Sequence, residues 1–338
     1  MSQVDWVRFC QVIRQHDRFL LTSHIRPDCD ALGSELGMAG VLRAMGKTVK
    51  IINGHATPPN LRFIDPLHEL QAIGVDVTLE QVLADDFQVL IVLDTSAWAQ
   101  LGPMGDVLRQ TTAKKIILDH HLSSDDLGAE EFKNTTAEAT GRLVVEAAHH
   151  LGVALTPEMA APLFAAVATD TGWFRFGSAG SGTYRTGAEL IDAGAKPSAI
   201  YNALYEQDTL ARVKLVGRIL ARAETLLEGR LIHTAALLED FQATGALPQD
   251  TEDVINLTLQ VGGTQVAIIL VEQASGGFKI SFRSRCHVEC NKLAEKFNGG
   301  GHKAAAGAFI KEPFAVAQKM VLEAAVQAIT NDELQITN

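Results

Sequence analysis

Three short apolar segments of this chain each run directly into a group of acidic and histidine residues, and this pattern limits the fold more than any other feature. Segment 88–93, apolar from its second residue onward, is followed by an aspartate, and Lys115–Leu118 leads into Asp119–His121. An earlier apolar segment, 18–22, precedes His24–Asp30. Uninterrupted apolar runs are typical of parallel strands buried on both faces, and open parallel sheets bind ligands at the carboxyl ends of their strands. The pattern therefore predicts an α/β domain whose functional groups meet at one edge of the sheet.

The chain is long enough for two domains. Its 338 residues allow two domains of ordinary size, each with its own core. The distribution of apolar residues predicts an N-terminal parallel-sheet domain over 1–205, a helical linker over 206–228 and a smaller α/β domain over 229–338.

The composition argues against several classes of function. The formal net charge of −11 argues against binding long DNA or RNA, because Lys and Arg supply most of that affinity. A short nucleotide is still an expected substrate, since metal ions can offset acidic residues within a site. The apolar runs are much shorter than the ~20 residues that a spanning helix needs, which predicts no membrane contact. The four cysteines show no disulfide framework, which favours a cytoplasmic location.

The strongest functional signal is a set of acidic and histidine residues at these strand ends, joined by one aspartate at a predicted helix end. The set is His24, Asp28, Asp30, Asp94, Asp119, His120, His121 and Asp170. Each residue alone could be a helix cap or a satisfied polar group, but their joint position at three strand ends indicates a metal site. Imidazole with carboxylate suits manganese, iron, zinc or cobalt. There are more ligands than one metal uses, which predicts two ions about 3.5–4 Å apart and phosphoester hydrolysis.

The order and spacing of this set resemble the DHH phosphoesterase family. His24-x-x-x-Asp28-x-Asp30 is followed by Leu93-Asp94-Thr95, by Asp119-His120-His121 and by Asp170. Segment 299–307, GGGHKAAAG, is similar to the signature of the type-1 DHH-associated domain that often follows. The resemblance covers nearly the whole chain. It implies a parallel-sheet DHH domain joined by a helical linker to a smaller α/β domain, with the active site in the cleft between them.

The resemblance also implies a role for each residue of the set. His24 and Asp28 would hold one divalent metal ion, Asp30, His120 and Asp170 would hold a second, and Asp94 would bridge the two and serve catalysis. Manganese is the expected metal. His121 would face the substrate and neutralise charge or protonate the leaving group, and Asp119 would orient His120.

In the predicted second domain, three consecutive glycines indicate a loop, because glycine is unfavourable inside a helix or strand. Such a loop lets backbone N–H groups approach an anion, and the resemblance implies that Gly300, Gly301 and His302 bind substrate. Arg283, at a predicted strand end, resembles the family's substrate-binding arginine, and its planar guanidinium suits a phosphate. The structural alternative for the glycine segment is a turn that binds no ligand. The structural alternative for Arg283 is a surface ion pair.

Within the family, the two-domain length is most similar to members that hydrolyse short oligoribonucleotides and convert 3'-phosphoadenosine 5'-phosphate to AMP and phosphate. Four alternatives stay open: a linear or cyclic dinucleotide phosphodiesterase, a RecJ-type single-strand exonuclease, a pyrophosphatase, and a regulator that binds nucleotides without turnover. The apolar content also permits a homodimer. Trp173 and Phe174, shortly after Asp170, could line the cleft, although core packing is the more common use of such residues.

Overall fold

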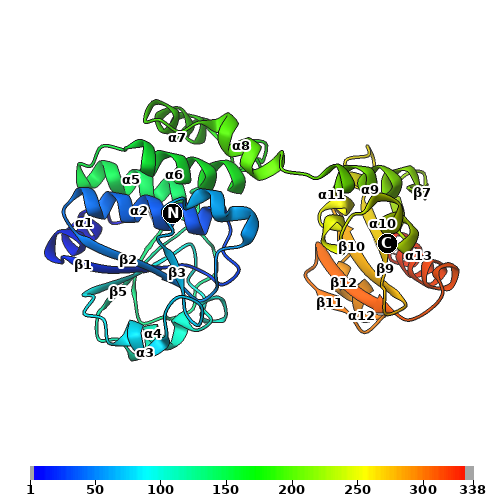
Figure 1. The fold of residues 1–338 in the computed structure, drawn as a ribbon, viewed down its shortest axis with the longest axis horizontal. Coiled ribbons are helices and arrows are strands. Elements are labelled where there is room, and N and C mark those ends of the chain that lie inside the picture. The colour runs from blue at the N-terminus through cyan, green and yellow to red at the C-terminus, as the bar shows by residue number, and fades with distance from the viewer. Residues whose placement is uncertain (1–3, 332–338) are drawn as a thin grey trace. The chain divides into compact units, whose positions relative to one another are not determined.

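The computed structural model describes residues 4–331, which form two compact units (Figure 1). The boundary between the units lies between Gln207 and Asp208. Each unit is an α/β structure built on a six-stranded sheet, which confirms the predicted fold class. Within the described residues, no helix combines the length and apolarity needed to cross a membrane.

The sheet of the first unit is parallel throughout, with the strand order β3-β2-β1-β4-β5-β6. Its strands are β1 Arg18–Thr22, β2 Thr48–Asn53, β3 Leu70–Ala72, β4 Val89–Leu93, β5 Lys114–Asp119 and β6 Glu130–Lys133. The chain places β2 and β3 on one side of β1, then returns to place the later strands on the other side. The order therefore reverses between β1 and β4, and ligand-binding crevices form at the carboxyl ends of strands at such a reversal.

Helices cover both faces of this sheet (Figure 1). One face packs against α1 Trp6–Gln15, α2 Cys29–Ala44 and α5 Thr140–Leu151, and the other against α3 Leu79–Leu83 and α4 Met104–Gln110. α6 Pro157–Asp170 packs on α2 and α5, and it also contacts α7 Ser181–Asp192 and α8 Pro197–Tyr205.

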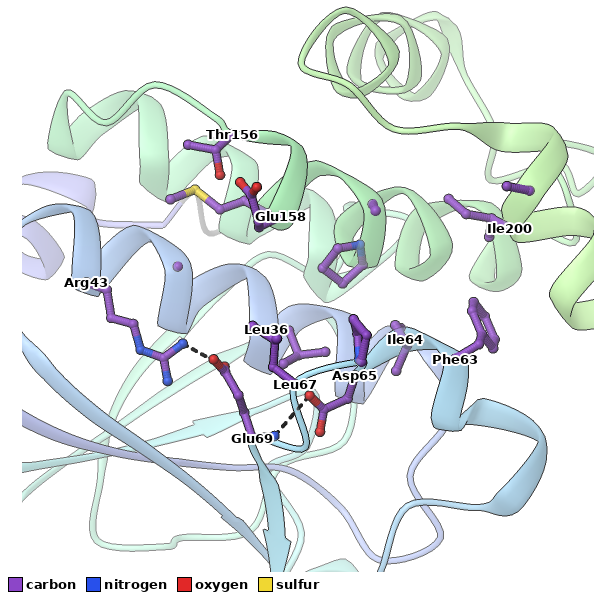
Figure 2. Close-up of a pocket in the computed structure, with 16 residues that line it drawn as sticks. Leu36, Arg43, Phe63, Ile64, Asp65, Leu67, Glu69, Thr156, Glu158 and Ile200 are labelled. Carbon is purple, nitrogen blue, oxygen red and sulfur yellow. Dashed lines mark hydrogen bonds and ion pairs between the residues drawn. The ribbon is translucent and has the colours of Figure 1, made fainter.

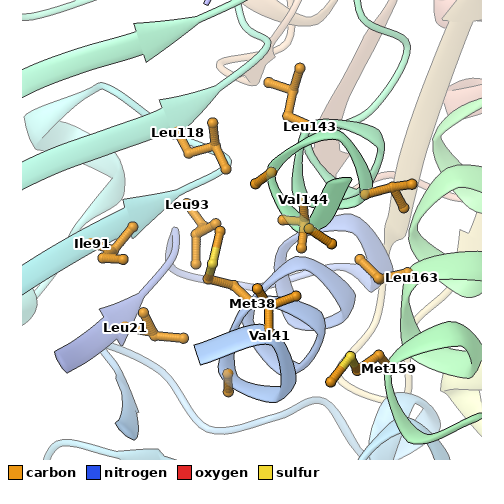
Figure 3. Close-up of a cluster of buried hydrophobic side chains, with 14 of the residues drawn as sticks. Leu21, Met38, Val41, Ile91, Leu93, Leu118, Leu143, Val144, Met159 and Leu163 are labelled. Carbon is orange, nitrogen blue, oxygen red and sulfur yellow. The ribbon is translucent and has the colours of Figure 1, made fainter. Parts of the chain in front are cut away.

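The strands are buried on both faces, which explains their uninterrupted apolar sequences. Leu21, Ile91 and Leu118 belong to the apolar layer beneath α2 and α5 (Figure 3). Leu20 and Leu90 belong to the layer on the opposite face, beneath α3 and α4. Successive side chains of a strand point to opposite faces. Because both faces are covered by apolar layers, the strand sequences have no alternating polar residues.

Helices α2 and α6 pack close together, because glycines line their contact. A methyl group at Gly33 would lie 2.3 Å from the backbone oxygen of Pro162, and one at Gly37 would lie 2.5 Å from the Leu163 side chain. The two helices are antiparallel, because Gly33 meets Ala166 whereas the later Gly40 meets the earlier Met159. The first turn of α2 therefore meets the last turn of α6, which ends at Asp170.

The second unit is built on a mixed sheet with the order β11-β12-β10-β9-β8-β7. Its strands are β7 Glu224–Leu226, β8 Leu231–Ala236, β9 Val266–Glu272, β10 Phe278–Ser284, β11 Gly300–Gly301 and β12 Ala305–Ile310. Strands β8 and β9 are parallel, and the other neighbours are antiparallel. One apolar layer contains α12 Cys290–Glu295 and α13 Phe314–Asn331, and the other contains α9 Leu210–Ala221 and α11 Val254–Thr258, beside α10 Leu238–Thr244.

The segment 206–228, assigned to a linker from the sequence, contains α9 and β7. Leu215 and Ile219 of α9 are fully buried in the same apolar cluster as Ile232 of β8, and β7 pairs with β8. The helical periodicity of this segment therefore comes from packing on the second sheet.

The prediction of a continuous loop over the glycine-rich segment is wrong, because Gly300–Gly301 form strand β11. This strand pairs with Ala306 and Gly307 of β12. A methyl group at Gly301, where φ is +144°, would lie 2.6 Å from the Cα atom of Ala306. The two backbones come so close that glycine is needed here in spite of its low strand propensity.

Candidate metal centre

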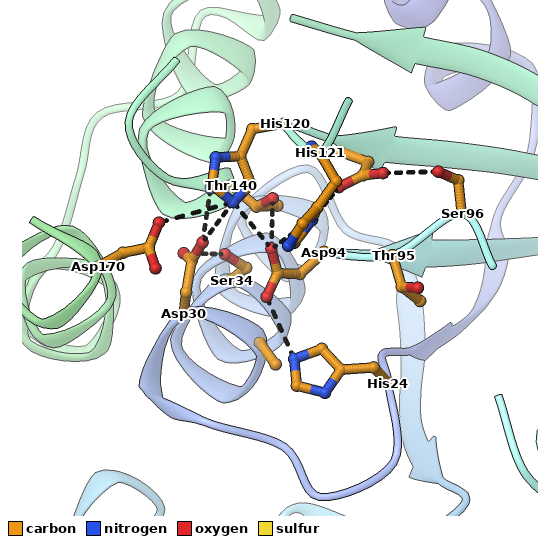
Figure 4. A network of polar contacts seen from close by, with 12 residues as sticks. His24, Asp30, Ser34, Asp94, Thr95, Ser96, His120, His121, Thr140 and Asp170 are labelled. Carbon is orange, nitrogen blue, oxygen red and sulfur yellow. Dashed lines mark hydrogen bonds and ion pairs between the residues drawn. The ribbon is translucent and has the colours of Figure 1, made fainter. Parts of the chain in front are cut away.

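The sheet and two helix ends bring the predicted ligands together in the first unit (Figure 4). His24 follows β1, Asp94 follows β4, and His120 and His121 follow β5, while Asp28 and Asp30 begin α2 and Asp170 ends α6. Among the described residues, the ligand atoms form three groups, each within 4.8 Å: His24, Asp28 and Asp94; Asp30, His120 and Asp170; and Asp94, His120 and His121.

Asp94 lies where the first two groups meet. Its Oδ2 atom is 3.4 Å from Nε2 of His24, and its Oδ1 atom is 3.5 Å from Nε2 of His120. Nε2 of His120 is also 3.7 Å from Oδ2 of Asp30 and 3.6 Å from Oδ2 of Asp170. One carboxylate therefore faces ring nitrogens from two different strand ends.

The backbone at Asp94 adopts a left-handed conformation, with φ +60°. Aspartate tolerates this region better than most residues with a side chain. Its backbone N–H still continues the sheet by donating to Leu118, and its Oδ1 atom accepts a hydrogen bond from the Thr140 hydroxyl at 2.9 Å. The bend and the threonine together fix the direction of the carboxylate.

The helix termini fix two further carboxylates. Asp28 caps α2, because its Oδ1 atom accepts hydrogen bonds from the backbone N–H groups of Asp30 and Ala31. The buried Asp30 accepts hydrogen bonds from the first two N–H groups of α5, those of Thr140 at 2.7 Å and Gly141 at 2.8 Å. Unsatisfied N–H groups at a helix N-terminus favour a negative charge, so α5 helps to hold Asp30 in place.

The ring nitrogens that face the carboxylates are suited to bind a cation. Nδ1 of His24 lies 3.0 Å from the Ile25 carbonyl oxygen, and Nδ1 of His120 lies 3.2 Å from that of Ala137. A carbonyl can only accept, so Nδ1 of each ring donates and Nε2 is the nitrogen directed at the carboxylates. Metal-binding histidines commonly have this arrangement.

Several carboxylates in the cluster bind protons more readily than usual. Burial and then the charge of Asp94 raise the pKa of Asp30 well above its ordinary value. Burial and then the charge of Asp28 do the same for Asp94, and burial raises the pKa of Asp170. A set of mutually repelling carboxylates, of which Asp30 and Asp94 are buried, fits a divalent cation, which would relieve both the desolvation and the repulsion.

Asp119 contacts His121 and not His120, so the prediction that it orients His120 is wrong. The Oδ1 atom of Asp119 accepts hydrogen bonds from Nδ1 of His121 at 2.8 Å and from its backbone N–H at 3.0 Å. Oδ2 accepts from Ser96 at 2.8 Å and lies 3.2 Å from Nζ of Lys133. Burial opposes ionisation, but the hydrogen bonds from His121 and Ser96 prevail and lower the pKa of Asp119 to about 2. The hydrogen bond to Asp119 in turn raises the pKa of His121.

A second group of buried polar residues supports the strand end that precedes His24. The Oδ1 atom of Asn53, at the end of β2, accepts the backbone N–H of Ser23 at 3.0 Å. The amide of Asn53 donates to Glu35 of α2 at 2.9 Å. All three residues are buried. Sequence reasoning missed Ser23, Glu35 and Asn53, together with Ser96, Lys133 and Thr140, because isolated polar residues carry no motif.

In the second unit, Arg283 lies on β10 and His302 directly follows β11, and β12 runs between these two strands. Arg283 of β10 pairs with Ala305 of β12, and the backbones of Ala305 and His302 exchange hydrogen bonds. Directly paired residues of an antiparallel sheet point to the same face, so the alanine separates the two basic side chains. Gly301 precedes His302, at the end of β11.

An apolar cavity of about 480 Å³ lies between α2, α6, α8 and the 3₁₀ helix η1 Pro59–Ile64 (Figure 2). Leu36, Met159 and Ile200 are among the residues that line it. None of the candidate metal ligands lines this cavity. It adjoins later turns of α2 and the first turns of α6, away from the ends that carry Asp30 and Asp170.

Comparison with known proteins agrees with this architecture. Residues 18–167 match the N-terminal domain of the DHH family, and residues 241–331 match the DHHA1 domain. The bifunctional oligoribonuclease and PAP phosphatase NrnA of Thermus thermophilus is 31% identical over 92% of this chain and 90% of its own length. The protein of the same name from Bacillus subtilis is 28% identical over 89% of this chain and 91% of its own length. An exopolyphosphatase-related protein from Bacteroides fragilis has a similar fold, with a TM-score of 0.80, 24% identity and coverage of 98% and 97%.

A parallel sheet that gathers carboxylates and ring nitrogens at its reversal point, followed by a second α/β unit, defines the class of protein as a hydrolase acting on phosphoester bonds. Within this class, the chain belongs to the DHH family and carries a DHH domain followed by a DHHA1 domain.

Proposed function

We propose that the protein hydrolyses short oligoribonucleotides and converts 3'-phosphoadenosine 5'-phosphate to AMP and phosphate. The observation that carries the proposal is the position of Asp94 between two ligand groups that hold ring nitrogens and carboxylates. Two relatives that cover most of this chain are named for both activities. The acidic net charge supports a short substrate in place of a long nucleic acid.

Each ligand group would hold one divalent metal ion. His24 and Asp28 form one group with Asp94, and Asp30, His120 and Asp170 form the other. We propose manganese, which accepts both imidazole and carboxylate ligands. When bound, two such ions polarise a phosphoryl oxygen and make a water molecule more acidic. Thr140 would keep the carboxylate of Asp94 directed at both ligand groups, because its hydroxyl donates to Oδ1 of Asp94.

His121 is suited to donate a proton to the leaving oxygen. Asp119 fixes its Nδ1 atom, which leaves Nε2 as the nitrogen that can meet a substrate. The same contact keeps the imidazole protonated to higher pH. Its side chain is 46% exposed, whereas that of His120 is 15% exposed. His121 is therefore the more accessible ring for a substrate.

We propose that the face of the second unit formed by Arg283, Gly300, Gly301 and His302 binds the substrate. Ala305 leaves room between the two basic side chains, and a guanidinium can hold a phosphate through two hydrogen bonds. Contacts of this face with the substrate would limit the length of substrate that is accepted. The four free thiols fit the proposed cytoplasmic location.

The proposal is tested by comparing the wild type with Asp94→Asn. Asparagine tolerates a positive φ and can still accept from Thr140, so the substitution removes the charge with little change of shape. With manganese, the wild type should cleave a 5'-labelled diribonucleotide and 3'-phosphoadenosine 5'-phosphate, and a chelator should abolish both activities. Asp94→Asn should lower kcat/KM for both at least about a thousandfold, or about 4 kcal/mol.

Three results would contradict the proposal. Ordinary rates in Asp94→Asn would remove this residue from the catalytic centre. Cleavage of cyclic dinucleotides but of neither proposed substrate would identify a different phosphodiesterase. Binding of nucleotides without any metal-dependent turnover would identify a regulator.

A further inference from the structure

The segment that follows Asp170 has an unusual backbone conformation. Gly172, Trp173 and Phe174 have φ values of +57°, +60° and +61°. Bulky residues rarely adopt this region, at a cost on the order of 1–3 kcal/mol each, so the surrounding structure must enforce it. The backbone N–H of Trp173 donates to Ala168 at 2.6 Å, and that of Phe174 donates to the Thr171 hydroxyl at 3.1 Å. This turn ends α6 and brings the indole of Trp173 against α8.

Trp173 supports two tyrosines that lie one turn apart on α8. Its ring centre is 5.0 Å from that of Tyr201 and 5.7 Å from that of Tyr205, both in edge-to-face geometry. The two tyrosine rings are 5.0 Å apart. The ring centre of Trp173 is also 6.0 Å from that of the buried Phe164. Tyr201 is 39% exposed and Tyr205 is 50% exposed. Trp173 therefore links the exposed pair Tyr201 and Tyr205 to the buried Phe164.

This aromatic pair adjoins the metal centre. Helix α8, which carries both tyrosines, packs on α6, whose last residue is the candidate ligand Asp170. Trp173 is three residues beyond Asp170. The tyrosines therefore pack on a ring that directly follows the end of α6, which supplies one candidate metal ligand.

Arg175 adds a positive charge at this place. Its side chain is exposed, and it follows Trp173 by two residues. Its Nε atom donates to the Gly172 carbonyl at 2.7 Å, and its other nitrogens make no hydrogen bond within residues 4–331. An anionic ligand with a flat aromatic part would use both the guanidinium and the rings. A nucleotide has these two properties, whereas an apolar segment of a protein would leave the arginine unused.

We propose that Tyr201 and Tyr205 form a subsite on which a nucleobase of the substrate stacks, with Arg175 contacting an adjacent phosphate. The inference rests on the proposed function and adds the feature that would select nucleotides over other phosphoesters. Stacking tolerates all bases because each has a π face, so the subsite would bind different bases with similar strength. The enforced turn at Trp173 would keep the tyrosines in place before the substrate arrives.

The test compares Tyr205→Ala with Tyr205→Phe, which retains the ring. With manganese and diadenosine monophosphate, Tyr205→Ala should raise KM about tenfold or more and leave kcat nearly unchanged, the size expected for the loss of one stacked base. Tyr205→Phe should stay within about twofold of the wild type. With a dinucleotide that lacks the stacked base, Tyr205→Ala and Tyr205→Phe should have the same KM. An equal KM in all three proteins would overturn the proposal.

A binding measurement separates this proposal from the proposed function. Trp173 contacts both tyrosines, so nucleotide binding should change its fluorescence, and the inactive Asp94→Asn protein allows binding without turnover. Added 3'-phosphoadenosine 5'-phosphate should change the signal in Asp94→Asn, and the additional Tyr205→Ala substitution should weaken binding about tenfold. This result would support the subsite even if the wild type cleaved neither substrate. Unchanged binding, or a change of oligomeric state caused by Tyr205→Ala, would overturn it and identify a contact between chains.

Discussion

Glu35 is a buried carboxylate close to the metal centre that is not one of its candidate ligands. It lies in α2 without solvent exposure, and its Oε2 atom accepts a hydrogen bond from Asn53. Its Oε1 atom has no partner among residues 4–331. Burial raises the pKa of Glu35 to about 7, so below about pH 7 the folded protein favours the protonated form.

This shift predicts a pH-dependent effect of Glu35→Gln. Because the pKa is raised on folding, the native state keeps its proton while the unfolded state loses one above the ordinary pKa of 4.5. The wild type therefore loses stability as the pH rises from about 4.5 to about 7, by on the order of 3 kcal/mol in total. Glutamine does not titrate, so the variant should gain stability relative to the wild type between pH 5 and pH 8.

Urea unfolding of both metal-free proteins at these two pH values measures the difference. The other carboxylates of the centre are common to both proteins, so their titration largely cancels. A difference in unfolding free energy that stays constant with pH would show that Glu35 is already ionised at pH 5.

At the scale of helices, the close packing of α2 on α6 controls the geometry of the ligands. A methyl group at Gly33 would collide with the backbone of Pro162, which can move only if α6 moves. Gly33→Ala should therefore destabilise the protein by about 1–3 kcal/mol and weaken metal binding, because Asp170 ends α6. Chemical unfolding and manganese titration followed by calorimetry measure the two effects.

Gly217 provides the matched control. It lies within the exposed face of α9, and a methyl group there would meet nothing within 4 Å. Gly217→Ala should stabilise the protein by about 0.5–1 kcal/mol through its higher helix propensity, with no effect on metal affinity. Equal effects of the two substitutions would show that the α2–α6 contact is not sterically limiting.

The short strand β11 permits a similar comparison. A methyl group at Gly301 would collide with β12, whereas one at Gly300 would meet open space. We expect Gly301→Ala to cost about 1–3 kcal/mol of stability and Gly300→Ala to leave the thermal midpoint nearly unchanged. If the backbone at Gly300 contacts the substrate, Gly300→Ala should still raise KM. An unchanged KM in the stable variant would remove Gly300 from the proposed binding face.

The sequence was sufficient to predict elements whose signal is local. The uninterrupted apolar runs of β4 and β5 predicted their burial, and the end of each strand predicted where ligands would meet. β6 was missed because its four residues include three charged ones, Glu130, Glu131 and Lys133. β3 was missed because it has only three residues.

The partner of Asp119 was missed for a geometric reason. Successive residues of an extended chain point to opposite sides, so Asp119 shares a side with His121 and not with His120. Contacts such as Thr140 to Asp94, which join residues 46 positions apart, depend on the tertiary fold and could not be read from a motif.

At the scale of the whole molecule, each unit contains the parts that its own folding requires. The apolar clusters of the first unit contain only its own residues, and the same holds for the second. All candidate metal ligands lie before residue 208, whereas Arg283 and His302 lie after it. Metal binding and the proposed contacts of the substrate with the second domain should therefore be separable by dividing the chain.

We expect a fragment of residues 1–207 to fold and bind manganese, because its sheet, both core layers and every candidate ligand are retained. Manganese should raise its melting temperature, since a ligand that binds only the native state stabilises it. The fragment should hydrolyse a diribonucleotide with a KM raised at least about tenfold, because the contacts from Arg283 and His302 are lost. The complementary fragment, residues 208–338, should fold without any response to manganese. If the first fragment folds and does not bind manganese, a ligand must come from the second unit, and the assignment of the metal centre to the first unit alone would be wrong.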